Sequence, residues 1–61
     1  MKTDQELADD LVSAWGYLYS SDGNEGDTMV RAIRIEAGDT RFDTIYELAS
    51  ARWRVMTGQE N

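Results

Sequence analysis

The stretch TRFDTIYELASARWRVMT, residues 40–57, decides the fold of this chain. Wound as an α-helix, it places its large apolar side chains on one side, at the spacing that a buried helical stripe requires. The members of this stripe are Phe42, Ile45, Tyr46, Ala49, Trp53 and Met56. Asp43, Glu47, Ser50 and Arg54 fall on the other side. We therefore predict a helix over 40–57 that the rest of the chain must cover.

Both ends of this predicted helix carry local signals. Thr40 can cap the first turn, and Asp43 three residues later completes a weak capping box. Gly58 suits the left-handed position that commonly ends a helix.

Residues 3–19 predict another helix. Thr3 and Glu6 form the T-x-x-E capping box, in which each side chain satisfies a backbone N–H of the other residue. The apolar residues Leu7, Leu11, Trp15 and Leu18 share one face. Gly16 weakens the segment by about 1 kcal/mol relative to Ala.

The segment between these two helices is less clear. Residues 20–27, SSDGNEGD, are all polar or Gly and read as a connection. Residues 28–37 read as a short helix with a narrow apolar stripe, closed by Gly38, although Ile35 lies off that stripe. The alternative is a strand, but Arg31 interrupts its alternation and it would have no pairing partner. We favour the helix.

The predicted fold is thus all-α, a single small domain over 1–61 with three helices near 3–19, 28–37 and 40–57. Its core is small, because a chain of 61 residues buries only about 60% of the surface that its unfolded form exposes. Small cores gain most from a second subunit, so we also expect a helical homodimer. Ile35, Leu48 and Val55 are apolar residues left over for that dimer interface.

Composition excludes several classes of function. The formal net charge of −6 argues against direct binding to nucleic-acid phosphates. The chain has no Cys and no His, which removes thiolate chemistry, the commonest metal ligand and the commonest general base. No apolar run approaches the roughly 20 residues of a membrane span, and the start MKTDQEL lacks the apolar region of a signal peptide. A cytoplasmic location is expected.

Three specific motifs can also be set aside. An EF-hand loop starting at Asp22 would need Gly where Asp27 stands and Glu where Ile33 stands. A helix-turn-helix around Gly38 would place Asp39, Thr44 and Glu47 at positions that motif keeps apolar. Two groups of carboxylates close in sequence could suggest an acid–base site, namely Glu6, Asp9 and Asp10, and Asp43 and Glu47. Both groups fall on predicted solvent faces, where they form no active-site cleft. We expect no enzyme, no catalytic residues, no cofactor and no metal.

Charge is divided unevenly along the chain. Residues 1–27 carry seven acids and one Lys, whereas all five Arg residues follow residue 27. The predicted first helix therefore has an acidic face, formed by Glu6, Asp9, Asp10 and Tyr17. Such a face can steer a basic protein surface toward it, or can be no more than a solvated helix face.

These observations predict a non-enzymatic protein that binds and modulates a basic protein partner through the acidic face. In size, charge and lack of catalytic residues the chain is similar to the small inhibitors that phages carry against host or defence proteins, anti-CRISPR proteins and DNA mimics among them. That resemblance implies a viral inhibitor of a protein, without direct nucleic-acid or membrane binding. The alternative is a structural or assembly protein that acts through helical homo-oligomerisation.

Overall fold

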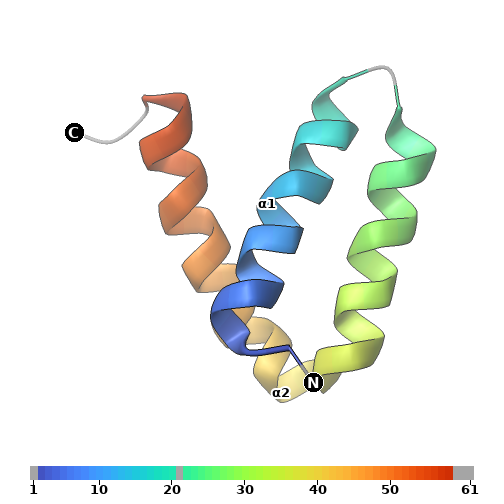
Figure 1. Ribbon diagram of the computed structural model, residues 1–61, viewed down its shortest axis with the longest axis vertical. Coiled ribbons are helices and arrows are strands. Elements are labelled where there is room, and N and C mark those ends of the chain that lie inside the picture. Colours follow the sequence, from blue (N-terminus) through green and yellow to red (C-terminus); the bar gives the residue numbers. More distant parts are fainter. Residues whose placement is uncertain (1, 21, 59–61) are drawn as a thin grey trace.

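The computed structural model describes residues 2–20 and 22–58, and all regular structure within these ranges is helical. Helix α1 spans Asp4–Tyr19 and helix α2 spans Gly23–Thr57. Figure 1 shows α1 lying between two arms of α2, which folds back at its middle. Helix α1 and the two arms of α2 lie side by side in one layer, with extents of 30 × 27 × 16 Å. The prediction of an all-α fold is confirmed, and residues 28–37 are helix and not strand.

A sharp bend at Gly38 corrects the prediction of three separate helices. The Gly38 backbone has φ 80° and ψ 163°, in a left-handed region that residues with a side chain rarely adopt. Helical geometry resumes at the next residue, so the segments predicted near 28–37 and 40–57 are arms of one kinked helix. We call residues 23–37 the first arm and residues 39–57 the second arm. Thr40 lies inside the second arm and does not cap its start.

The first arm begins earlier than predicted, because α2 starts at Gly23 and takes in most of the expected connection. Gly26 is buried against α1. A Cβ atom at Gly26 would lie 2.8 Å from the Ala14 carbonyl oxygen and 2.9 Å from the Leu18 amide nitrogen. The two backbones therefore approach so closely that only Gly fits between them. Gly26 is a helix-packing residue, although its polar neighbours make it resemble a turn residue.

The predicted helix ends are confirmed at both extremes of the fold. The Thr3 side chain accepts a hydrogen bond from the Glu6 amide at 3.2 Å, and the Glu6 carboxylate accepts one from the Thr3 amide at 3.0 Å. Gly58 ends α2 in the left-handed conformation, with φ 73°. These contacts satisfy backbone groups that a helix terminus otherwise leaves unpaired.

The core lies where α1 meets both arms near the bend. Leu7 and Leu11 of α1 and Ile45 of the second arm are its largest fully buried side chains. Ala8, Ile33 and Ala49 complete the buried cluster. Tyr46 and Met56, predicted to belong to the buried stripe, are instead 52% and 61% exposed. The reason is that α1 covers the second arm from one side only, so the margins of the stripe remain in solvent.

Two glycine substitutions test the close approach at Gly26. Replacing Gly26 with Ala should lower the free energy of unfolding by about 1–3 kcal/mol, because the new Cβ overlaps backbone atoms that no side-chain rotation can move. Gly16→Ala is the matched control, since no atom lies within 4 Å of its Cβ position. It should raise the free energy of unfolding by up to about 1 kcal/mol. Urea titration followed by circular dichroism measures both, and stabilisation by both substitutions would contradict the proposed packing.

Candidate functional site

The predicted partner-binding residues lie along α1 but are not equivalent. Glu6, Asp9 and Asp10 occupy its first two turns and are exposed or half-buried. Tyr17 lies about 10 Å further along the helix axis, as seven residues of helical rise require. It is 43% exposed.

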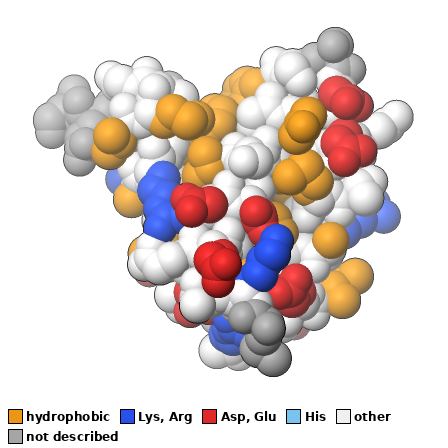
Figure 2. Space-filling view, viewed as in Figure 1, with side chains coloured by type: hydrophobic (Ala, Val, Ile, Leu, Met, Phe, Trp, Pro, Cys, Tyr) orange, Lys and Arg blue, Asp and Glu red, His pale blue; other side chains and the backbone are white. Residues whose placement is uncertain are grey.

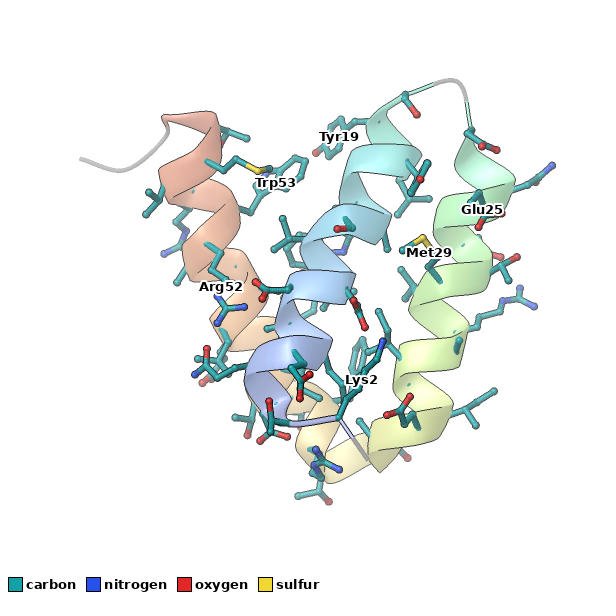
Figure 3. All side chains as sticks on the ribbon, in the orientation of Figure 1. Lys2, Tyr19, Glu25, Met29, Arg52 and Trp53 are labelled. Carbon is teal, nitrogen blue, oxygen red and sulfur yellow. The ribbon has the colours of Figure 1, made fainter. Side chains whose placement is uncertain are left out.

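Both aspartates are engaged in ion pairs, which the sequence analysis did not anticipate. The Lys2 ammonium donates to Asp10 at 2.6 Å. Arg52, on the second arm, pairs with Asp9 and donates to the Gln5 carbonyl oxygen at 2.8 Å. Figure 3 shows the Arg52 side chain beside α1. The predicted acidic face is therefore partly neutralised from within the chain.

A third ion pair joins the same two elements. Arg41 at the start of the second arm pairs with Asp4 at 2.6 Å, and both side chains are 36% exposed. Two arginines of the second arm, Arg41 and Arg52, thus reach across to acids of α1. In the sequence, the separation of most acids from all five arginines was the feature that could have indicated ion pairs between the two helices. Each pair contributes only about 0–1 kcal/mol at such exposure, so the pairs align the second arm more than they stabilise it.

An acid surplus remains around Lys2. The hydrogen bond and the negative charge of Asp10 raise the pKa of Lys2 above its ordinary value, and Glu36 and Glu6 raise this pKa further. Lys2 therefore stays charged throughout the neutral range. Glu36 has no ion-pair partner among residues 2–20 and 22–58. We call Glu6, Asp9, Asp10 and Glu36 the acidic cluster, and Figure 2 shows acidic groups gathered around basic ones on this face.

The residues predicted for a dimer interface lie on both arms of α2 and differ in exposure. Ile35 is 83% exposed on the first arm, and Val55 is 63% exposed on the second. Leu48 is half-buried and packs against the core.

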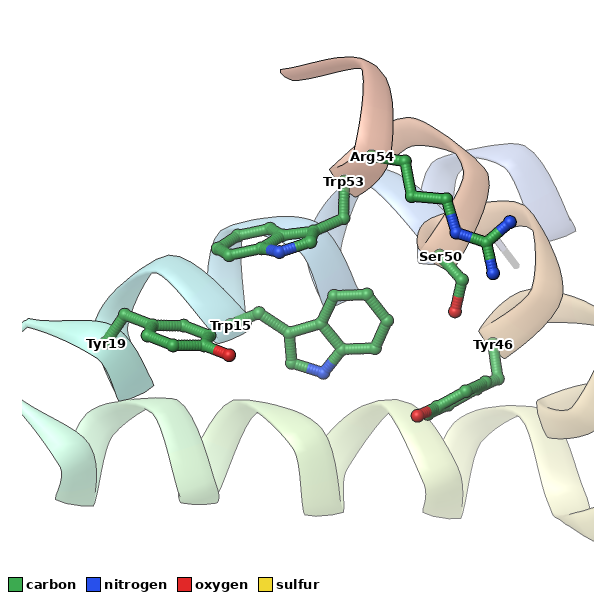
Figure 4. Close-up of a pocket in the computed structure, with 6 residues that line it drawn as sticks. All are labelled: Trp15, Tyr19, Tyr46, Ser50, Trp53 and Arg54. Carbon is green, nitrogen blue, oxygen red and sulfur yellow. The ribbon is translucent and has the colours of Figure 1, made fainter. Parts of the chain in front are cut away.

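Four aromatic rings meet between the second half of α1 and the second arm, which the sequence analysis missed. The Trp15 ring lies 5.4 Å from Tyr46 and 5.9 Å from Trp53, with interplanar angles of 72° and 87°. Tyr19 stacks on Trp53 at 5.3 Å. In Figure 4 the broad face of Trp15 lies between Trp53 on one side and Tyr46 on the other. The rings therefore form an open box.

This box belongs to a groove of about 340 Å³. We call it the aromatic groove, and its lining residues are Trp15, Tyr19, Tyr46, Ser50, Trp53 and Arg54. The groove runs along the border between the apolar and the polar sides of the second arm. The sequence analysis assigned Tyr46 and Trp53 to the buried side of this helix and Ser50 and Arg54 to the solvated side. In the structure all four residues line the same groove. The signal available was the number of aromatic residues, six, which is large for so small a core.

The polar lining of the groove is one-sided. Its groups with a fixed hydrogen-bonding role are all donors, namely the two indole N–H groups and the Arg54 guanidinium. Among residues 2–20 and 22–58, no Asp or Glu belongs to the lining. Within the described part of the chain, Arg54 is also the one cationic side chain that has no acidic partner.

Comparison of the chain with protein-family models, with curated proteins and with solved structures finds no match. Over the described residues, no group of three or more acidic side chains is placed to hold a metal ion. Neither helix, as far as it is described, has the length and hydropathy of a membrane span.

Trp53 links the groove to the stability of the fold. It was predicted to lie in the apolar stripe, and it is half-buried beside Trp15. Trp53→Ala should therefore lower the free energy of unfolding by about 2 kcal/mol, roughly half of the cost for a fully buried Trp. Val55→Ala, two residues along the same helix and mostly exposed, should change it by less than about 0.5 kcal/mol. Equal urea midpoints for Trp53→Ala and the unmodified chain would show that the ring contacts do not support the fold.

Proposed function

We propose that this chain is a non-enzymatic protein that binds and modulates a basic protein partner, in the manner of a small phage inhibitor of a host or defence protein. The acidic cluster and its surroundings form the contact surface. The observation that carries the proposal is the charge surplus of this cluster, in which four carboxylates face two cations, Lys2 and Arg52.

The exposure of the cluster favours fast and selective association with a basic surface more than high affinity. Its carboxylates are exposed or half-buried and lie on rigid helices, so a basic surface can approach without displacing any part of the fold. Exposed charges of this kind raise the rate of association and select against partners of like charge. The partner's cations would compete with Lys2 and Arg52 for Asp10 and Asp9. Glu6 and Glu36 need no such exchange, because neither pairs with a cation among the described residues.

That difference identifies a clean variant. Glu6→Gln with Glu36→Gln changes the formal net charge from −6 to −4. Gln retains the capping box at the start of α1, and the Asp9 and Asp10 ion pairs remain in place. If the cluster binds a basic partner, the double variant should capture less of that partner, most clearly at low salt, where the Debye length exceeds about 10 Å. Quantitative capture from lysate on immobilised protein measures this.

A matched control separates a local effect from one of total charge. Asp43→Asn with Glu47→Gln makes the same change in net charge on the second arm, and neither residue is among the carboxylates that act on Lys2. The control should capture as much partner as the unmodified chain. Equal capture by all three proteins at every salt concentration would eliminate the acidic cluster as the contact surface.

A second candidate function is assembly through self-association. The observation that favours it is the exposure of apolar side chains on the outer surface, with Ile35 at 83%, Val55 at 63% and Met56 at 61%. Val55 and Met56 adjoin Ala51 and Arg52 in an apolar hollow on the second arm. Burying such surface between two copies would contribute about 25 cal/mol for each Å².

Self-association predicts a particle of twice the 6.9 kDa chain mass at micromolar concentration. Val55→Glu should return it to the monomer mass, because an unpaired carboxylate would be buried at the contact. Sedimentation equilibrium measures both species. A single species of chain mass at high protein concentration would leave partner binding as the function.

A further inference from the structure

We propose that the aromatic groove is a binding site for a small aromatic carboxylate. The ligand's ring would lie against Trp15, between Trp53 and Tyr46. Its carboxylate would accept hydrogen bonds from the Arg54 guanidinium and the Ser50 hydroxyl. This site is separate from the acidic cluster and does not depend on the proposed function.

The arrangement of the rings supplies the first argument. Trp15 is nearly perpendicular to both Tyr46 and Trp53, so the three rings form a box with an open side (Figure 4). A ligand ring in this box would stack on one wall and meet the others edge to face, and aromatic pairs prefer both of these geometries. Tyr19 stacks on Trp53 beside Trp15 and extends the aromatic surface of the box.

The charge of the groove supplies the second argument. The chain has twelve acids and six bases, yet the described residues that line the groove include one base and no acid. The other cations of the described residues each pair with a carboxylate within the chain, and Arg54 does not. A guanidinium presents several N–H groups in a planar fork that matches a carboxylate. Ser50 lies one helical turn before Arg54 and can donate to the same group.

The size of the groove argues for a small molecule over a protein. Its volume of about 340 Å³ lies at the lower end of the range for small-molecule sites. It is lined by six residues, whereas one side of a protein–protein interface takes about 20–30 residues. Boxes of aromatic rings also bind quaternary ammonium ions. Here the positive charge of Arg54 disfavours a cation, so the anion is the better match.

The experiment uses probes that differ only in charge. Phenylacetate, 2-phenylethanol and phenethylamine are titrated into the full chain, and the indole N–H signals of Trp15 and Trp53 are followed by NMR. Phenylacetate should bind with a Kd on the order of millimolar, as expected for so small a ligand. It should bind about tenfold more tightly than either of the other two.

Two variants of equal charge localise the effect. Arg54→Gln should remove the preference for phenylacetate while leaving weak binding of 2-phenylethanol. Arg31 lies on the first arm, pairs with Asp27 and does not line the groove. The preference for phenylacetate should therefore survive in the Arg31→Gln variant. Circular dichroism confirms that both variants are folded.

Several results would overturn the proposal. They are tighter binding of phenethylamine or tetramethylammonium than of phenylacetate, a preference that persists in Arg54→Gln, and no shift of either indole signal with any probe. A peptide that ends in a free Phe carboxylate provides a further arm. If it bound much more tightly than phenylacetate, the occupant would be a protein terminus and the assignment to a small molecule would be wrong.

Discussion

The left-handed turn at Gly38 is the constraint on which the rest of the structure depends. A straight helix with the 35 residues of α2 would extend roughly 50 Å and could cover α1 from one side only. The turn reverses the chain within a single residue, so that α1 lies between both arms. Leu11 of α1, Ile33 of the first arm and Ile45 of the second arm then belong to one core. On a straight helix, Ile33 and Ile45 would lie about 18 Å apart along the axis and would point about 120° apart around it.

The thin layer that results explains where the aromatic side chains lie. The second arm lies closer to α1 in the half that follows the bend, as Figure 1 shows, and the buried Ala49 stands near the middle of this arm. Further along, the arm diverges from α1, as Figure 1 shows, and large rings occupy the widening space. Trp15 and Trp53 are only half-buried there, because no third element covers them. The aromatic groove is thus a direct product of the angle between these two helices.

Local signals in the sequence were sufficient for the all-helical class and for three of the four helix ends, although not for the number of helices. The capping box of Thr3 and Glu6 and the terminal Gly58 both work through contacts between residues close in sequence, so they could be recognised in advance. Gly26 and Gly38 could not be interpreted in the same way. Whether a glycine ends a helix, bends it or admits another helix depends on what lies beside it in space. That information is absent from the local pattern.

The same distinction applies to the surface. The acids of α1 were correctly placed on an exposed face, but their partners Arg41 and Arg52 come from a distant part of the chain. Helical periodicity alone gives no relative position for the two segments. The aromatic groove likewise could not be predicted from the second arm alone, because two of its lining residues, Trp15 and Tyr19, come from α1.

Eight described residues are buried, four in each helix, and half of these are Ala or Gly. The fold therefore rests on a few small contacts, namely the core cluster of α1 with both arms and the close approach of Gly26 to α1. Most other positions have little influence on folding. Substitutions at exposed positions away from caps and bends typically change stability by less than about 0.5 kcal/mol. The two broad faces of the layer can thus diverge independently of each other and of the core. Selection could give this scaffold a new partner by changing one face, while the contacts that specify the fold stay the same.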